Sequence, residues 1–244
     1  ENYTGRDTQE KVRNFIKDAA ATWETEFVLL GGDISVVPYR STYVYYNGYS
    51  STDCAADIYY SDLDGDFNAD NDSIWGETSD NVDLRPDVIV GRAPADNPTQ
   101  MDVFVDKTLK YEKEPPGGYL GNVTLAGEYL DDTTNSSVGL DRIKNNLLPS
   151  TVNSTSLFDD AKGDFGNLNR NTFMAQVDNG LSYIFHAGHC NWNVMSVGTA
   201  GSGSLYNSHV SGYKGGYKIG VMNSVGCITT RFSQNDCIAE LHVM

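Results

Sequence analysis

The stretches LSYIFHAGHC (residues 181–190) and KIGVMNSVGC (residues 218–227) decide the fold expected for this chain. Each is a short apolar run that ends in small residues and then presents a reactive side chain, His189 in the first and Cys227 in the second. Apolar runs of this length bounded by glycine are typical of central strands in a parallel sheet. Ligands in open α/β sheets bind beyond the carboxyl ends of such strands. We therefore expect an imidazole and a thiol to meet at one edge of a sheet.

The composition indicates a globular protein. The 244 residues are enough to bury a substantial core, and the 39% hydrophobic content with 24 Gly and 15 Tyr excludes a disordered or collagen-like chain. No apolar run is long enough to cross a membrane. The net charge of −16 disfavours nucleic acid and anionic membrane surfaces as partners, and it favours cations.

The cysteines define neither a zinc knuckle nor a dense disulfide scaffold, so the redox state of Cys54, Cys190 and Cys237 stays open. No signal peptide is visible, and residue 1 is not typical of a natural start, so we expect a mature or cut fragment of a longer chain. Sequons of the Asn-x-Ser/Thr type are compatible with an extracellular protein.

Alternating helix and strand signals extend along the rest of the chain. We expect helices over residues 8–24, 101–114, 139–148 and 171–178, and strands over residues 27–30, 43–46, 58–60, 88–90 and 123–128. A helix N-cap at Thr8 begins the series. The run Pro115-Pro116-Gly117-Gly118 is the best boundary, because Pro and Gly together stop a helix. This pattern predicts an N-terminal α/β subdomain over residues 1–114 and a catalytic subdomain over residues 115–244, built on a mostly parallel sheet flanked by helices.

An acidic loop, SDLDGDFNADND (residues 61–72), crowds oxygen ligands onto a short segment. A hard cation such as Ca²⁺ needs six to eight converging oxygens, and without a cation the repelling carboxylates would be costly to order. The loop is not an EF-hand, because Phe67 and Ser73 stand where an invariant Gly and a bidentate Glu belong. A solvated acidic loop is the alternative. The expected structural Ca²⁺ ligands are Asp62, Asp64, Asp66, Asn68, Asp70 and Asp72.

A thiol becomes a good nucleophile when a neighbouring base lowers its pKa, and His189 is the natural base for Cys227. The alternative for Cys227 is a small buried hydrophobe. His186, His189 and Cys190 also suggest zinc, but an H-x-x-H after a strand does not share one face as i, i+4 does on a helix. We therefore expect His186 to be a structural hydrogen-bonding residue beside the site.

The chain resembles the gingipain-like cysteine peptidases of the caspase-like clan. Their signature is an apolar strand leading to His-Gly and a second one leading to Ala-Cys or Gly-Cys, which YIFHAGHC and IGVMNSVGC match. The segments FVLLGGD, PDVIVGRAP, CITTRFSQNDCIAEL and the acidic loop with its following Gly76-Glu77 also resemble family stretches, in the same order. The resemblance spans nearly the whole chain and implies a caspase-like three-layer α/β fold in two packed subdomains.

The resemblance also implies roles for residues of the site. It makes Cys227 the nucleophile, His189 the proton-transfer partner and Glu128 the carboxylate that orients the histidine. Asp141 corresponds to an acidic residue that holds a basic P1 side chain in gingipains, and its alternative is an Asp near a helix N-terminus. Backbone amides near the histidine and at the cysteine form the oxyanion hole in this clan, which places Gly188 and Cys190 against the substrate. Cys190 departs from the family's Gly, although any residue except Pro supplies an N–H.

These observations predict a secreted or cell-surface cysteine endopeptidase that cleaves peptide bonds after Arg or Lys, with Asp or Asn at P1 left open. Family members extend beyond both ends of this chain, so the resemblance implies a propeptide or a second processed chain of the same precursor as a partner. The competing hypothesis is a non-catalytic, Ca²⁺-stabilised surface or adhesion module that keeps the peptidase fold.

Overall fold

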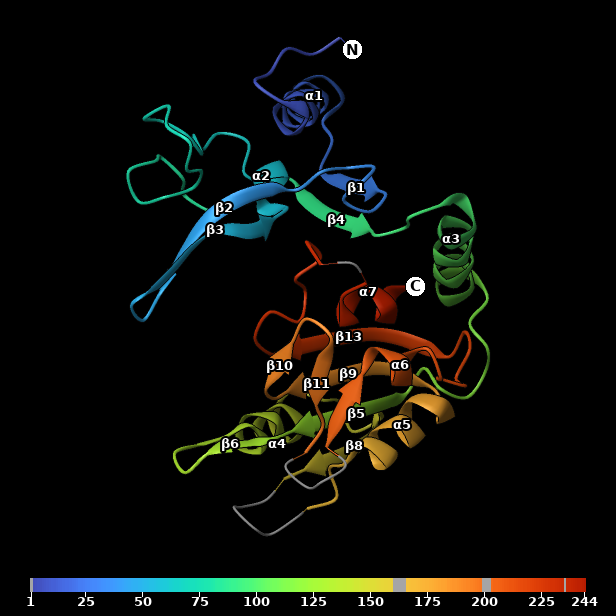
Figure 1. Cartoon of the computed structure of the whole chain (residues 1–244). Coiled ribbons are helices and arrows are strands. Elements are labelled where there is room, and N and C mark those ends of the chain that lie inside the picture. Colours follow the sequence, from blue (N-terminus) through green and yellow to red (C-terminus); the bar gives the residue numbers. More distant parts are fainter. Residues whose placement is uncertain (1, 160–165, 199–202, 235) are drawn as a thin grey trace. The chain divides into compact units, whose positions relative to one another are not determined.

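In the computed structural model, which describes residues 2–159, 166–198, 203–234 and 236–244, the two stretches that end in His189 and Cys227 are neighbouring parallel strands (Figure 1). They belong to a four-stranded, all-parallel sheet in the order β13-β9-β5-β8. Its strands are β5 (Asn122–Gly127), β8 (Asn153–Phe158), β9 (Leu181–Ala187) and β13 (Ile219–Val225).

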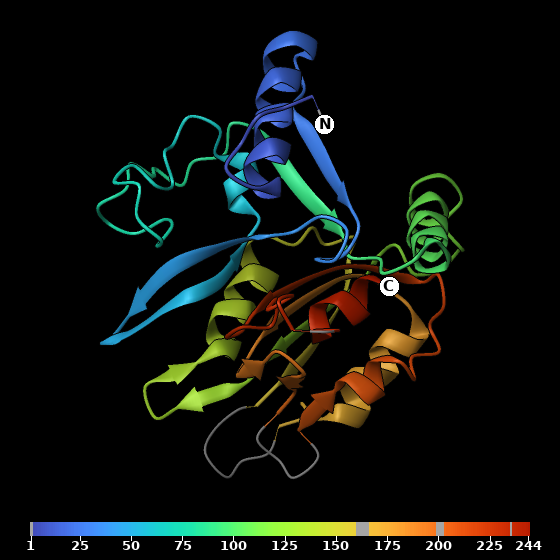
Figure 2. The ribbon, with the colours of Figure 1, turned by 45° about the horizontal axis from the view of Figure 1, so that its top comes forward.

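Helices cover both faces of this sheet, because its inner strands are apolar on both sides. In β5, Leu125 packs toward α4 (Ser136–Asn146), while Ala126 packs toward α5 (Arg170–Asn179) on the opposite face. Both residues are fully buried, as expected for an inner strand of a parallel sheet. The shorter helices α6 (Asn207–Val210) and α7 (Ile238–Val243) join the α5 face. The result is the three-layer, caspase-like α/β arrangement that the sequence predicts (Figure 2).

Short strands that the sequence did not reveal flank the sheet. An antiparallel ribbon contains β10 (Cys190–Asn191), β11 (Val194–Ser196) and β12 (Ser204–Tyr206). A hairpin contains β6 (Tyr129–Asp131) and β7 (Thr134–Asn135). Segments of two or three residues are too short to show a period of alternation, and β8 also escaped notice because NSTSLF is mostly polar.

The chain divides into two compact units, residues 1–104 with residue 244, and residues 105–243. This division falls within α3 (Pro98–Lys113), earlier than the Pro-Gly segment at which we placed the boundary. None of the helices in the described ranges is both long and apolar enough to cross a lipid bilayer.

The first unit contains α1 (Thr8–Trp23), a parallel pair of β1 (Phe27–Gly31) with β4 (Ile89–Ala93), and a hairpin of β2 (Arg40–Tyr46) with β3 (Tyr49–Ala56). The N-cap of α1 is Asp7 and not Thr8, since its side chain accepts the Glu10 N–H at 2.9 Å. The core of this unit includes Ile16, Leu30 and Val88.

One predicted strand is wrong. Residues 58–60 lie in a helical turn, α2 (Ile58–Ser61), although tyrosines favour strands. Tyr59 and Tyr60 are both buried and their ring centroids lie 5.5 Å apart, whereas successive side chains of a strand point to opposite faces. Tertiary packing therefore overrides the local preference.

Two strands whose apolar sequences indicated a buried position are partly exposed to solvent. β13 is an edge strand of the described sheet, with Val221 47% and Val225 69% exposed. In β1, Leu30 is buried but Phe27 and Leu29 are exposed. An apolar run therefore indicated the strand correctly but not its place in the sheet.

Candidate active site

Strands β9 and β13 place the candidate base and nucleophile at equivalent positions. Their last paired residues are Ala187 and Val225, and the Gly188 N–H donates to the Val225 carbonyl oxygen at 3.1 Å. His189 and Cys227 each follow two residues after that last pair. Both residues are exposed, and the Cys227 thiol is not in a disulfide. The chain thus presents an imidazole and a thiol at the carboxyl ends of adjacent parallel strands.

The turn that carries Cys227 is tightly constrained. Ile228, the next residue, has φ 43°, which is unusual for a β-branched residue and marks local strain. Thr229 is buried, and its hydroxyl donates to the Gly226 carbonyl oxygen at 3.1 Å. The strained turn projects Cys227 toward solvent.

Cys190 fills the space beside this turn. Its Sγ would lie 2.3 Å and its Cβ 2.9 Å from a Cβ at position 226, so any residue larger than glycine there would force Cys190 or the turn to move. The Cys190 thiol is half-buried and 3.6 Å from the Gly188 carbonyl oxygen. Burial raises the pKa of the Cys190 thiol, and nearby hydroxyl and backbone donors offset this only in part. Cys190 is therefore a neutral packing residue at neutral pH.

Glu128 lies directly after β5 and is 4% exposed. Its Oε2 accepts the backbone N–H of His189 at 2.6 Å, and its Oε1 accepts a hydrogen bond from the Ser196 hydroxyl. Neither carboxylate oxygen bonds to the His189 ring among the described residues. The structure thus brings Glu128 to the main chain of His189 and not to its ring.

Two residues that we expected to contact the substrate, Asp141 and Gly188, make other contacts in the structure. Asp141 is exposed on α4, where its carboxylate accepts from the Asn145 side chain at 2.7 Å, and no contact joins it to the other candidate site residues within the described ranges. The N–H groups of Gly188 and His189 are already bonded to Val225 and Glu128. The N–H of Cys227, in contrast, donates to nothing in the part of the chain that the structure describes.

His186 is buried beside the site, and both of its ring nitrogens are engaged. Nδ1 lies 2.9 Å from the Ser224 hydroxyl and Nε2 lies 2.8 Å from the Ser196 carbonyl oxygen. No ring nitrogen of His186 is left for zinc, which favours the structural role. Sequence reasoning did not single out Ser196 or Ser224, since neither has a local signature.

The acidic loop gathers into two groups of carboxylates, and in each group the ligand atoms lie within 4.8 Å of one another. Asp62 and Asn68 are buried, and Oδ2 of Asp62 and Oδ1 of Asn68 have no hydrogen-bond partner in the described chain. Asp66 joins neither group, whereas two residues that we did not predict do. The groups are Asp62, Asp64 and Asp87, and Asp70, Asp72 and Glu77.

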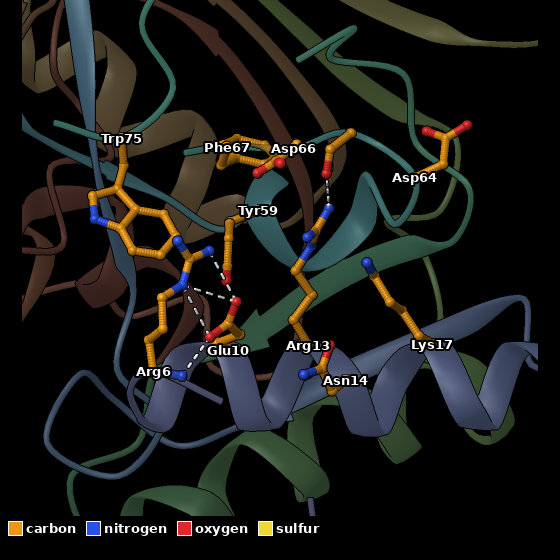
Figure 3. Close-up of a pocket in the computed structure, with 11 residues that line it drawn as sticks. Arg6, Glu10, Arg13, Asn14, Lys17, Tyr59, Asp64, Asp66, Phe67 and Trp75 are labelled. Atoms are coloured by element: carbon orange, nitrogen blue, oxygen red, sulfur yellow. Dashed lines mark hydrogen bonds and ion pairs between the residues drawn. The ribbon is translucent and has the colours of Figure 1, made fainter. Parts of the chain in front are cut away.

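A hollow of about 320 Å³ lies between α1 and this loop (Figure 3). Lys17 lines it without an ion pair among the described residues, and burial and then the charge of Arg13 lower the pKa of Lys17. Charges of both signs line the hollow, three of each, so it indicates no ligand class. They are Arg6, Arg13 and Lys17 against Glu10, Asp64 and Asp66.

The fold and the site define a class of protein, namely an α/β protein of caspase-like architecture with a thiol and an imidazole at the ends of adjacent parallel strands. The chain belongs to peptidase family C25, whose family model matches residues 1–244.

Solved structures share this fold. The Arg-specific cysteine proteinase gingipain R (RgpB) superposes with a TM-score of 0.71 at 17% identity, over 99% of this chain and 50% of that chain. The complex of RgpB pro- and mature domains from Porphyromonas gingivalis gives 0.69 at 18% identity, over 96% and 49%. A structure described only as a protease gives 0.70 at 19%, over 98% and 46%. The chain thus spans about half the length of these structures. A comparison with curated proteins returned no match.

Proposed function

We propose that this chain carries the catalytic dyad of a cysteine endopeptidase. The observation that carries the proposal is the equivalent placement of His189 and Cys227 beyond the last pair of two neighbouring parallel strands. Membership of peptidase family C25 supports the same reaction. A thiol and a base on adjacent strand ends are what thiol-dependent acyl transfer requires.

The reaction would follow from these groups. His189 takes the Cys227 thiol proton, and the sulfur attacks the peptide carbonyl carbon to form a C–S bond. The oxyanion faces the Cys227 N–H, which no described acceptor occupies. The C–N bond then breaks as His189 protonates the departing amine. Water attacks the thioester with His189 as base, and Cys227 is released as a thiol with the acid product.

Glu128 would assist through the main chain. By accepting the His189 N–H, it holds the loop that carries the imidazole and leaves the ring itself free to turn toward Cys227. We infer a basic P1 residue, and the description of gingipain R as Arg-specific supports this. Asp141 is the candidate partner for that side chain, on the basis of family resemblance and its exposure.

The test is hydrolysis of a fluorogenic peptide panel that varies only P1, with Ca²⁺ and a reductant. We expect cleavage after Arg or Lys that is lost in Cys227→Ala and kept in Cys54→Ala, a matched change at another exposed free cysteine. Asp141→Asn should raise KM for basic P1 residues. If no peptide is cleaved and Cys227 is alkylated no faster than Cys54, the non-catalytic module replaces this proposal.

We also propose structural Ca²⁺ on the acidic loop. The buried, unpartnered oxygens of Asp62 and Asn68 support this, because an oxygen-binding cation would satisfy them. Submillimolar Ca²⁺ should raise Tm by several degrees, and a chelator should reverse the shift. Asp62→Asn should abolish the response, and Asp102→Asn, at an exposed Asp on α3, should not. An equal response to Mg²⁺, or none to Ca²⁺, would remove the metal.

The remaining expectations concern the surroundings of the protein. We propose an extracellular location and a partner from the same precursor, either a propeptide or a second chain. The solved complex of RgpB pro- and mature domains supports the partner class. Isolation of the native protein and sequencing of every associated chain would test both.

A further inference from the structure

The imidazole of His186 connects three elements at the candidate active site. His186 lies one residue before the end of β9 and is 1% exposed. Its Nε2 lies 2.8 Å from the carbonyl oxygen of Ser196 in β11, and its Nδ1 lies 2.9 Å from the hydroxyl of Ser224 in β13. Phe173 of α5 packs edge-on against the ring, with centroids 6.5 Å apart. The orientation of the ring is therefore fixed.

The hydrogen-bond partners determine the tautomer of this ring. A carbonyl oxygen only accepts, so Nε2 of His186 carries the hydrogen. Burial lowers the pKa of His186, against the opposing effect of the bond to Ser196, and the ring is neutral at pH 7. Nδ1 then has a free lone pair and accepts from the Ser224 hydroxyl. Because it is buried and bonded on both sides, His186 is not placed to exchange protons with a substrate.

Ser196 links this ring to the loop of the proposed base. Its N–H donates to the His189 carbonyl oxygen at 2.8 Å, and its hydroxyl donates to Glu128. Glu128 in turn accepts the His189 N–H at 2.6 Å. Ser196 and Glu128 thus hold the main chain of His189 from both sides, and His186 holds Ser196.

Ser224 links the same ring to the segment of the proposed nucleophile. It is the register partner of His186 in the sheet and precedes Cys227 by three residues. β13 is an edge strand that pairs only with β9 in the described sheet, so no strand supports it on its other side. The bond from Ser224 to His186 therefore adds a side-chain link to β9 just before the Cys227 turn.

We propose that His186 is a positioning residue that sets the distance between the proposed base and nucleophile by tying the His189 loop to the Cys227 segment. This inference rests on the proposed peptidase function. Without the ring, the backbone bond from Gly188 to Val225 still joins the two strands, but Ser196 and Ser224 lose their common anchor and the side chains beyond that bond can shift. A misplacement of about 1 Å costs on the order of 100-fold in rate.

The kinetic test uses His186→Phe, which removes both hydrogen bonds, His186→Gln, which keeps a donor for Ser196, and Ser224→Ala. The matched control is Ser182→Ala, because the Ser182 hydroxyl donates to the Asn122 carbonyl oxygen elsewhere on β9. We expect kcat of His186→Phe to fall about 100-fold with KM within about threefold. His186→Gln should recover part of this loss, and Ser182→Ala should match the wild type. Adding Ser224→Ala to His186→Phe should cost little more, since both break one network.

Rates are expressed per active site, counted by irreversible alkylation of Cys227. A merely structural His186 would lower the number of labelled sites and Tm but leave kcat per site unchanged, and that result would overturn the proposal. If His186→Phe fails to fold, the milder Ser224→Ala carries the same comparison against Ser182→Ala. Wild-type protein without Cys227-dependent hydrolysis would refute the peptidase function, and the positioning role with it. An active wild type with unaffected His186 and Ser224 variants would refute the positioning role alone.

A second measurement does not need activity. Nitrogen-15 spectra of the histidine-labelled protein should show one histidine as the neutral Nε2–H tautomer, unchanged between pH 7 and 8, and this signal should vanish in His186→Gln. A His186 signal that titrates in this range, or that shows hydrogen on Nδ1, would contradict the proposed network.

Discussion

At the scale of single residues, Cys190 and Gly226 explain how the site tolerates its departure from the family's His-Gly. The Cys190 thiol occupies the space that a side chain at position 226 would need. The family signature reads Ala-Cys or Gly-Cys at the second strand end, and here it must read Gly-Cys. The Cys190 side chain at the end of β9 thus fills the volume that Gly226 leaves free at the end of β13.

This pairing predicts a compensating variant. In Gly226→Ala the new Cβ would lie 2.3 Å from Sγ and 2.9 Å from Cβ of Cys190, so the Cys227 turn must shift. We expect kcat/KM to fall about 100-fold. The double variant with Cys190→Gly should recover most of the loss in a peptide assay. A double variant as impaired as Gly226→Ala would show that the collision is not the cause.

Gly188 is another residue-scale constraint. A Cβ there would lie 2.9 Å from Glu128 Oε2 and 3.0 Å from both His186 Nε2 and the Ser196 carbonyl oxygen. Because Gly188 has no side chain, Glu128, His186 and Ser196 can lie close to the loop that carries His189. The N–H of Gly188 itself is bonded to the Val225 carbonyl oxygen.

At the scale of elements, α1 is tied to the hairpin through its cap. The Asp7 carboxylate accepts the Glu10 N–H and forms a two-pronged ion pair with Arg40, both distances being 2.8 Å. Arg40 is 5% exposed and stacks on Trp75 at 3.6 Å. One side chain thus serves both as a helix cap and as the counter-charge of a buried cation.

We expect Asp7→Ala to destabilise the protein more than Asp7→Asn, since Asn keeps the capping oxygen, which is worth about 0.5–2 kcal/mol. Burial raises the pKa of Asp7, but bonds from Arg40 and the Glu10 N–H outweigh it and the net pKa is lowered from 3.8. The stabilisation that the ionised Asp7 carboxylate contributes is fully present above pH 3.8, the ordinary pKa of an aspartate. It is lost as the pH falls through the lower pKa that Asp7 has in the folded protein. Urea midpoints measured between pH 7 and 3 test this. Equal midpoints for the two variants at pH 7 would refute the capping role.

At the scale of the whole molecule, charge is the dominant feature. Asp and Glu total 33 against 17 Lys and Arg, and the net charge is −16. Such an excess destabilises the folded state by self-repulsion, and salt screens it, with a Debye length of about 10 Å at 0.1 M.

Salt and Ca²⁺ should therefore act separately. With chelator present, raising NaCl from 10 to 150 mM should raise Tm by a few degrees. Ca²⁺ added at 150 mM NaCl should raise it further, because site binding is not a screening effect. A Tm that falls with NaCl would mean that attractive ion pairs outweigh the repulsion.

The sequence by itself determined the elements that carry the site, namely two apolar runs ending in glycine and a reactive residue, the flanking helices and the acidic loop. These are local patterns, and periodicity and turn chemistry are properties of short segments. Only the tertiary structure decided that Glu128 holds the main chain of His189, 61 residues away, and that Asp87 joins the acidic loop. It also decided that Ser196 and Ser224 meet at His186, and that Tyr59 lies in a helix. Such contacts join residues distant in the chain, and no short segment records them.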